Sequence, residues 1–285
     1  MNGLSALRRR GEVLPALAVL ATLRARARQP IAVRHVAGSL TIASYNVHKC
    51  VGVDKRFDPW RVADVIAETG ADILALQEAD RRLGRRVGLL DMAAIERRTG
   101  LRLVPLSITP GGHGWHGNAL LVRVGQLAGV RRLTLPGGEP RGAVMVDLDL
   151  PEGRLRLVAA HLGLLKRHRE RQASAILAAL AEDAEVPTVM LGDLNEWRPG
   201  QRSSLGVLER SFGPAEPTPP TFPSRLPVLS LDRMLSNRPG LIGAAEAHDT
   251  PLARLASDHL PLRARLDPAI LAGGSPALDG VPEAA

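Results

Sequence analysis

The ten residues from Val186 to Asn195 constrain this chain more than any other stretch. Thr188 to Leu191 are apolar or β-branched, follow a proline and stop at a glycine, which predicts a short buried strand ending in a tight turn. Asp193 and Asn195 come just past that turn, and in an extended chain they would share one side while Leu194 points into the core. Together they can bind a metal-bound water and a phosphate oxygen. The alternative is an Asx turn, in which both side chains hydrogen-bond to their own backbone.

The composition predicts an ordinary globular core filled mainly by Leu, Val and Ala. Apolar residues make up 45% of the 285 residues, but aromatic residues only 2%. The single cysteine, Cys50, excludes an internal disulfide and a zinc site built from cysteines. No apolar run approaches the ~20 residues that span a bilayer. The chain is therefore long enough for one large α/β or sandwich domain, or for two modest ones.

Most of the positive charge lies in an N-terminal arm. Residues 1–36 carry seven Arg and one Glu, a net charge of +6 out of +8, so the high isoelectric point says little about nucleic-acid binding by the rest. Three interpretations of the arm stay open: a secretory signal, a helix on an anionic membrane surface, and a leader without a role. Because no clear cleavage site follows, we expect a cytoplasmic or membrane-peripheral protein rather than a secreted one.

Periodicity predicts one folded domain over residues 38–267, between the basic arm at 1–37 and a loose tail at 268–285. Helices are predicted over residues 58–68, 91–98 and 166–183. Strands are predicted over residues 40–45, 72–76, 102–105, 118–124, 130–135, 143–150, 155–160, 186–191, 231–236, 242–248 and 260–266. A proline-rich stretch, 212–227, is expected to be irregular. Many strands with few helices predict an α/β sandwich, with two sheets face to face and helices outside.

Polar residues recur where these strands end. In chain order they are Asn46, Glu78, His161, Asp193 with Asn195, Asp232, and Asp258 with His259. Since strands usually run out into neutral turn residues, this pattern indicates one shared pocket at an edge of the sandwich. A plainer interpretation stays open for each residue, such as an ion pair between Glu78 and a nearby arginine, or between Asp232 and Arg233.

Seven short motifs carry these residues. They are SYNVHK at 44–49, LQE at 76–78, HGNALL at 116–121, AHL at 160–162, GDLN at 192–195, LDR at 231–233 and SDHLP at 257–261. Each is weak alone, but their order resembles that of the endonuclease/exonuclease/phosphatase superfamily, which has the deoxyribonuclease-I-like fold. The resemblance covers residues 38–267. It implies a four-layer αββα sandwich of two mixed, mostly antiparallel sheets, and hydrolysis of a phosphate ester with Mg²⁺ or Mn²⁺.

The resemblance implies roles for the residues around the metal and the water. Glu78 is expected to be the main metal ligand, with Asn46 beside it. Asp258 would hold the metal directly or through water, since Mg²⁺ prefers oxygen ligands and keeps several waters. Asp193 would orient or deprotonate the attacking water, and Asn195 would hold a phosphate oxygen.

The resemblance also implies roles for the histidines. His259 is expected to act as the general base or as an imidazole that clamps the phosphate, and Asp232 would orient it. His161 would donate to a phosphoryl oxygen and stabilise charge in the transition state. Three neighbours of motif residues are expected to line the pocket: His48, His116 and Asn118.

The substrate stays open at this stage. His48 stands where some family members that act on abasic or duplex DNA carry an acidic residue, so no second carboxylate ligand is expected there. The arginines at 81, 82, 85 and 86 form either a phosphate-contacting loop or a solvated run of charge. We expect a monomer that acts on nucleic acid, a phospholipid head group as in a sphingomyelinase, or a sugar phosphate. The alternative is a catalytically silent protein that binds a phosphorylated ligand, or a membrane through residues 1–36.

Overall fold

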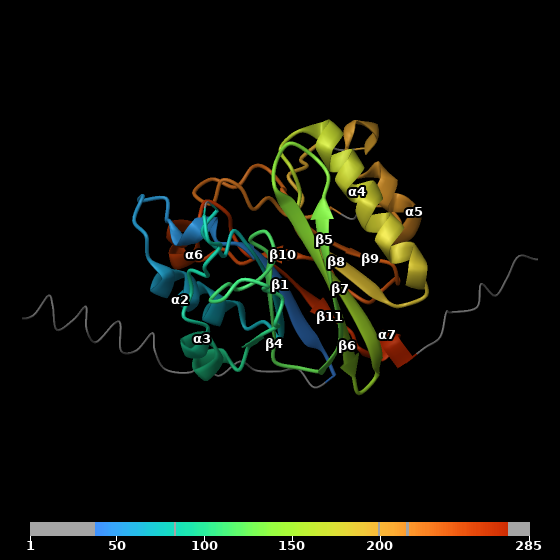
Figure 1. Cartoon of the computed structure of the whole chain (residues 1–285), viewed down its shortest axis with the longest axis horizontal. Helices are drawn as coiled ribbons and strands as arrows, with labels where there is room; N and C mark the ends of the chain where they lie inside the picture. The colour runs from blue at the N-terminus through green and yellow to red at the C-terminus, as the bar shows by residue number, and fades with distance from the viewer. Residues whose placement is uncertain (1–37, 83, 199, 215–216, 273–285) are drawn as a thin grey trace, which may run out of the picture.

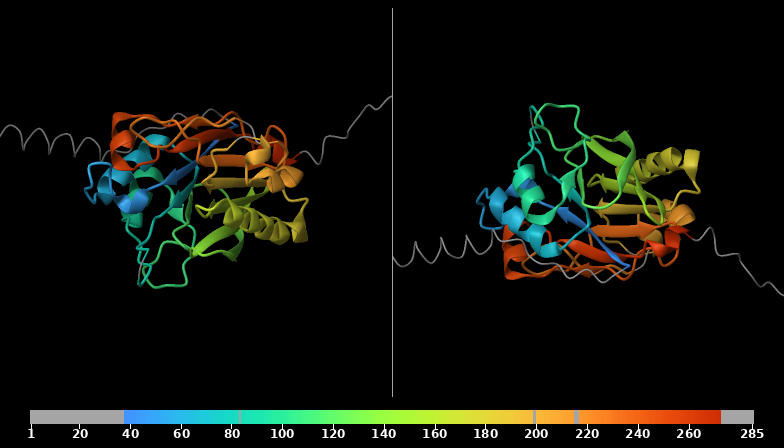
Figure 2. Two further views of the ribbon diagram at one scale, coloured as in Figure 1. Left: turned by 90° about the horizontal axis from the view of Figure 1, so that it is seen from above. Right: turned by 90° about the horizontal axis from the view of Figure 1, so that it is seen from below.

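Two β-sheets packed face to face, with helices on both outer sides, make up the described part of the chain. The computed structural model describes residues 38–82, 84–198, 200–214 and 217–272 (Figure 1). The sheets have the strand orders β10-β11-β1-β2-β4-β3 and β5-β6-β7-β8-β9. Views from above and below show helices flanking the paired sheets (Figure 2). This arrangement confirms the predicted αββα sandwich. The basic arm and the tail beyond residue 272 lie outside the described residues.

The strands follow the predicted order, with shifted ends. The six-stranded sheet contains β1 (Leu40–Asn46), β2 (Ile73–Gln77), β3 (Arg102–Leu103), β4 (Ala119–Val122), β10 (Glu246–Ala247) and β11 (Leu262–Leu266). The five-stranded sheet contains β5 (Gln126–Leu135), β6 (Arg141–Leu150), β7 (Gly153–His161), β8 (Thr188–Asp193) and β9 (Asp232–Ser236). The prediction of a strand over 242–248 is largely wrong. Ile242 makes only an isolated bridge to Leu266, so the paired segment shrinks to two residues at the sheet edge.

Helices cover each sheet on its outer face. Those beside the six-stranded sheet are α2 (Pro59–Thr69), α3 (Met92–Thr99) and α6 (Pro251–Ala256), and those beside the five-stranded sheet are α4 (Lys166–Leu180) and α5 (Glu209–Phe212). Short 3₁₀ turns occur at η1 (His48–Cys50), η2 (Ala181–Asp183), η3 (Gly200–Arg202) and η4 (Gly206–Leu208). In the described part of the chain, none of the helices is both long and apolar enough to span a bilayer.

Side-chain caps fix where the helices begin. The Asp58 carboxylate accepts a hydrogen bond from the Arg61 N–H at 3.0 Å, as expected for the cap before a proline at the first helical position. Helix α6 was not predicted, although Thr250 caps it in the same way. A further short helix, α7 (Ala269–Ala272), lies within the predicted loose tail. It forms because Ile270 and Leu271 pack against the core.

The sheets bury apolar side chains on both faces. Side chains alternate along β1, so that Ile42 lies between the sheets whereas Ala43 faces the helices of the outer layer. The same alternation occurs in β2, where Ile73 and Leu74 are both fully buried. Strands covered on both faces read as continuous apolar runs, which explains the sequence pattern of β1, β2 and β8.

Strand register brings the polar ends together. β7 and β8 are parallel, and His161 pairs with Asp193 where both strands end. β9 runs antiparallel to β8, so its first residue, Asp232, also pairs with Asp193. In the other sheet, β1 and β2 are parallel and end together at Asn46 and Gln77. The two sheets therefore present their polar strand ends at one edge of the sandwich.

Candidate active site

Asp193 is the centre of a buried polar cluster at this edge. Its Oδ2 accepts a hydrogen bond from Asn46 Nδ2 at 2.9 Å and lies 3.4 Å from His161 Nε2 and 3.7 Å from His259 Nε2. All four residues are at most 5% exposed. Three predicted site residues, from strands of both sheets and from the segment before β11, therefore meet around the carboxylate of a fourth.

The other oxygen of Asp193 forms the Asx turn that was the alternative interpretation. Asp193 Oδ1 accepts from the Asn195 N–H at 3.0 Å, and Leu194 packs into the core beneath α4. The expectation that Asn195 continues an extended chain is wrong, because its φ of 53° is left-handed. Its amide Nδ2 donates to the Leu162 carbonyl at 2.9 Å, which commits one of its hydrogens. Thus one oxygen of Asp193 shapes the turn and the other faces the cluster.

The carboxylate of Asp193 has the properties of a base near neutral pH. Burial raises its pKa to about 6, and the charge of Asp232 adds to the rise, whereas His259, Asn46 and the Asn195 N–H oppose it. Such a group is ionised at neutral pH but holds a proton more readily than an ordinary aspartate. It is therefore suited to accept a proton from water.

His259 is held against a second buried carboxylate. Its Nδ1 donates to Asp232 Oδ2 at 2.8 Å, and the same oxygen accepts from Thr221 Oγ1 at 2.5 Å. Burial alone would lower the pKa of His259, but the charges of Asp232 and Asp193 outweigh burial and raise it to about 10. The ring is therefore an imidazolium at neutral pH. Of the two roles expected for His259, this favours the phosphate clamp over the general base.

His161 is neutral, because it is buried and its neighbours are cationic. Burial lowers its pKa well below the usual value, and the charge of Arg141 lowers it further. Arg141 Nη1 lies 2.9 and 2.8 Å from the two ring nitrogens, while its Nη2 donates to Glu139 at 2.8 Å. Sequence reasoning missed Arg141, which begins a strand rather than ending one. The antiparallel pairing of β6 with β7 puts that beginning beside the end that carries His161.

Glu78 lies in the adjoining cleft, where it pairs with the ammonium of Lys49. Glu78 has a left-handed φ of 55°, and Lys49 sits in a turn whose three residues, His48 to Cys50, have φ of 45°, 56° and 59°. Such conformations cost roughly 1–3 kcal/mol each and concentrate at functional sites. The alternative interpretation paired Glu78 with a nearby arginine, Arg81 or Arg82, but in the structure its partner is Lys49. Lys49 was not predicted as a site residue.

The donor set fits a hard divalent cation that keeps several waters. In the described residues, no three His, Cys, Asp or Glu side chains are placed to hold a metal ion. The Glu78 carboxylate is paired with the ammonium of Lys49, whose place a metal ion could take. Asn46 Oδ1 accepts one hydrogen bond, from the His48 backbone N–H at 3.0 Å, so this oxygen has a second lone pair for a metal ion. One carboxylate and one amide oxygen are sufficient protein ligands for Mg²⁺. Asp258 does not line the cleft of Glu78 and lies 3.6 Å from His48 Nδ1, so its part in metal binding stays a prediction.

The three expected pocket residues differ in their placement. His116 lines the cleft together with Glu78 and His161. His48 is half-buried beside it, with Nδ1 2.9 Å from the Val51 carbonyl. Asn118 is fully buried, and its amide donates to the carbonyls of Trp115 and Gly142, so it holds the turn of His116. It is not among the residues that line the cleft, and its part in the pocket stays a prediction.

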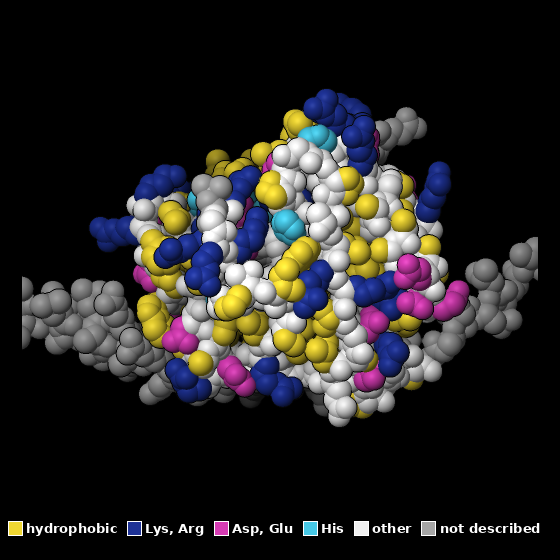
Figure 3. Space-filling view, in the orientation of Figure 1, with side chains coloured by type: hydrophobic (Ala, Val, Ile, Leu, Met, Phe, Trp, Pro, Cys, Tyr) yellow, Lys and Arg dark blue, Asp and Glu magenta, His cyan; other side chains and the backbone are white. Residues whose placement is uncertain are grey.

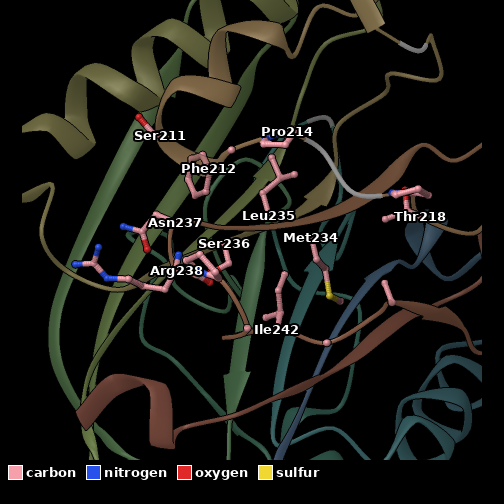
Figure 4. A pocket seen from close by; sticks show the side chains of 16 residues that line it. Ser211, Phe212, Pro214, Thr218, Met234, Leu235, Ser236, Asn237, Arg238 and Ile242 are labelled. Atoms are coloured by element: carbon pink, nitrogen blue, oxygen red, sulfur yellow. The ribbon is translucent and has the colours of Figure 1, made fainter. Parts of the chain in front are cut away.

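Another hollow lies outside the polar cluster, along β9 (Figure 4). Phe212, Met234, Leu235 and Ile242 supply apolar walls, and Arg238 contributes to the lining. None of its described lining residues is His, Asp or Glu, so it offers no group for acid–base chemistry. The cluster around Asp193 is the candidate active site.

Comparisons with known proteins agree with the fold. Residues 43–259 match the Endonuclease/Exonuclease/phosphatase family. The chain is similar to an endonuclease/exonuclease/phosphatase from Beutenbergia cavernae (TM-score 0.58, 21% identity, covering 80% of this chain and 71% of that one). It is also similar to the human Nocturnin catalytic domain with bound sulfate (0.57, 19%, 81% and 95%) and to a mannosyl-6-phosphatase of Bacteroides thetaiotaomicron (0.59, 15%, 79% and 98%). No curated protein sequence matches.

Proposed function

Because this chain belongs to the endonuclease/exonuclease/phosphatase family, we propose that it is a metal-dependent phosphoesterase. It hydrolyses a phosphodiester, or a phosphomonoester, by in-line attack of water on phosphorus. The observation that carries the proposal is that His161 and His259 meet on the single carboxylate of Asp193. One ring is neutral and the other is cationic, so the site contains a base, a donor and a fixed positive charge.

The buried groups divide the work of the reaction. Asp193, oriented by the amide of Asn46, takes a proton from the attacking water. His259, kept protonated by Asp232, puts positive charge beside the phosphoryl oxygens. His161 donates a ring N–H to a phosphoryl oxygen.

Two further groups stabilise charge on the phosphate. Arg141 contacts the His161 ring and so adds positive charge beside the phosphate that His161 binds. A divalent cation held by Glu78 and the oxygen of Asn46 would neutralise charge on the phosphate. The residues therefore act mainly by positioning and electrostatic stabilisation.

The substrate belongs to the phosphate esters, and several kinds fit the same chemistry. A mannosyl-6-phosphatase is among the similar proteins, which supports a sugar phosphate as one candidate. Nucleic-acid and phospholipid esters stay candidates because their hydrolysis needs the same catalytic groups. Contact of residues 1–36 with an anionic membrane, a cytoplasmic location and a monomeric state stay predictions. A catalytically silent binding protein is the alternative, but both histidines, Asp193 and Glu78 are present.

Hydrolysis of model phosphate esters tests the proposal. Purified protein is assayed with Mg²⁺ or Mn²⁺ on bis(p-nitrophenyl) phosphate and on p-nitrophenyl phosphate. We expect turnover of one or both, abolition by EDTA and recovery when the metal is restored. Full activity in the presence of the chelator would exclude the metal-dependent mechanism. Binding of inorganic phosphate without any turnover would favour the silent alternative.

A further inference from the structure

One side of the active-site cleft carries cationic groups that the mechanism above does not use. The cleft that contains Glu78 and His161 is also lined by Arg82, Arg86 and His116. Both arginines follow β2, and His116 belongs to the turn before β4. Lys and Arg side chains gather around a histidine near the middle of the face seen in Figure 3. These groups adjoin the catalytic cluster but come from different parts of the chain.

Acidic partners neutralise the two guanidinium groups to different degrees. Arg86 Nη1 lies 3.1 Å from the buried carboxylate of Asp80. Arg82 lies 3.8 Å from Glu139, beyond hydrogen-bond range, and its side chain is 51% exposed. Glu139 is already engaged, because Oε2 accepts from Arg141 at 2.8 Å and Oε1 from a backbone N–H at 3.0 Å. Arg82 therefore has donors for a ligand in the cleft.

His116 adds an unpaired polar atom to the same wall. Its backbone has a left-handed φ of 50°, and the buried Asn118 amide holds the turn that contains it. Among the described residues, the buried Nδ1 of His116 has no hydrogen-bond partner. Burial lowers the pKa of His116, and the charge of Arg86 lowers it further, so the ring is neutral and has a single N–H. That N–H is committed to the Pro140 carbonyl, so Nδ1 is an acceptor, and His116 shapes the wall without donating to a phosphate.

This wall lies next to the phosphate that would be hydrolysed. Arg141 contacts the His161 ring and also donates to Glu139 Oε2, and Arg82 Nη2 lies 3.8 Å from the same oxygen. Only the side chains of Glu139 and Arg141 therefore lie between His161 and a phosphate group bound at Arg82. A substrate with one phosphate at His161 and another at Arg82 needs its two anionic groups close together, as in neighbouring phosphates of one strand.

We propose that Arg82 and Arg86 bind a second phosphate group of the substrate. Arginine suits this role because its planar fork matches two phosphate oxygens. The substrate class is then a phosphodiester flanked by another phosphate, as in a short oligonucleotide, rather than an isolated phosphodiester. This inference rests on the proposed phosphoesterase function and names the class of substrate for that site.

Thymidine dinucleotides with the same scissile bond test the inference. The unphosphorylated dinucleotide is compared with its 5′-phosphorylated and 3′-phosphorylated forms, and the products are separated so that only cleavage of the internal diester is counted. In the wild type we expect one phosphorylated form to have a kcat/KM about ten-fold higher, equivalent to about 1.4 kcal/mol. Arg82→Gln and Arg86→Gln should each bring that ratio toward one. Arg154→Gln, which changes an exposed arginine paired with Asp149, is the matched control and should leave the ratio unchanged.

Two outcomes overturn the inference. Equal kcat/KM for the three dinucleotides does so, and so does a preference that survives both substitutions. Circular dichroism checks the fold of the Arg86 variant, and the exposed Arg82 gives a second, structurally tolerant variant. Hydrolysis of bis(p-nitrophenyl) phosphate distinguishes failure of the phosphate subsite from failure of the proposed phosphoesterase function. If the wild type hydrolyses this diester without any dinucleotide preference, only the phosphate subsite fails. If the wild type hydrolyses neither these diesters nor p-nitrophenyl phosphate, the proposed function fails as well.

Discussion

Replacing Asp232 by Asn removes one buried negative charge and almost no volume. Asp232 is fully buried, and its Oδ2 accepts from His259 Nδ1 at 2.8 Å and from Thr221 Oγ1 at 2.5 Å. The asparagine keeps an oxygen as acceptor but offers no charge to stabilise an imidazolium. Burial lowers the pKa of His259, and the charges of Asp193, 3.7 Å away, and Asp258 are then left to oppose that effect. We therefore expect the pKa of His259 to fall well below about 10 in Asp232→Asn.

The structure gives the size of the effect on stability. The gap between a pKa of about 10 for folded His259 and the ordinary value of about 6.5 corresponds to roughly 5 kcal/mol. Asp232 shares this stabilisation with Asp193, so its loss should lower the free energy of unfolding near pH 7 by ~3 kcal/mol, as for one partner of a buried ion pair. A raised histidine pKa stabilises the folded state fully below pH ~6.5, and the stabilisation is lost as the pH rises through about 10. The difference between wild type and variant should therefore narrow toward pH ~10.

Two measurements check this expectation. Urea unfolding near pH 7 and again near pH ~10 gives the difference in unfolding free energy at each pH. An NMR titration of the histidine ring protons gives the pKa of His259 in both proteins. The kcat should fall by roughly ten-fold, less than in His259→Ala, because Asp232 positions the imidazole without touching the substrate. A wild-type His259 that titrates near ~6.5, or unfolding free energies equal within ~0.5 kcal/mol, would refute the reasoning.

Two more substitutions test other parts of the account. Lys49→Met removes the ammonium that competes for Glu78, so Mn²⁺ binding followed by calorimetry should tighten by roughly three- to ten-fold; unchanged affinity would contradict the competition. Glu196→Gln leaves the fully buried Arg169 without its carboxylate partner at 3.0 Å, so the free energy of unfolding should fall by ~3 kcal/mol near neutral pH. Burial alone would raise the pKa of Glu196, but hydrogen bonds from Ser204, Arg198 and Arg169 lower it to about 2, so this stabilisation is present above pH ~4.5 and lost as the pH falls through about 2. Urea unfolding should show that the difference in unfolding free energy between wild type and Glu196→Gln becomes smaller in acid. A difference that is the same at all pH values would contradict this expectation.

The predictable part of the site follows from strand ends. A strand buried on both faces gives a continuous apolar run, so the position where each strand stops is visible in the sequence. Asp193, His161 and Asp232 each stand at such a position, and register brings them together because β7, β8 and β9 are neighbours. The fold class was predictable for the same reason, from many short apolar strands with few helices.

The residues that sequence reasoning missed act through partners far along the chain. Lys49 meets Glu78 from 29 residues away, and Arg141 meets His161 from 20 residues away. Neither cation lies in a local pattern that predicts such a contact, since a lone Lys or Arg usually belongs to a solvated surface. The left-handed backbone of Asn195 could not be predicted either, because an Asx turn and an extended chain are both compatible with Asp193 and Asn195 two positions apart.

Steady-state hydrolysis of bis(p-nitrophenyl) phosphate by wild type and Asp193→Asn, with saturating Mg²⁺ or Mn²⁺, tests the central claim most directly. Asparagine keeps an oxygen for the Asx turn but cannot accept a proton from water. We expect kcat to fall by ~10²-fold or more with an unchanged circular dichroism spectrum, as for a group that acts in the transition state. The acidic limb of the wild-type pH–rate profile, expected near the pKa of about 6 for Asp193, should be absent from the variant. A correctly folded variant whose kcat stays within about three-fold of the wild type would mean that the hydrolytic centre lies elsewhere.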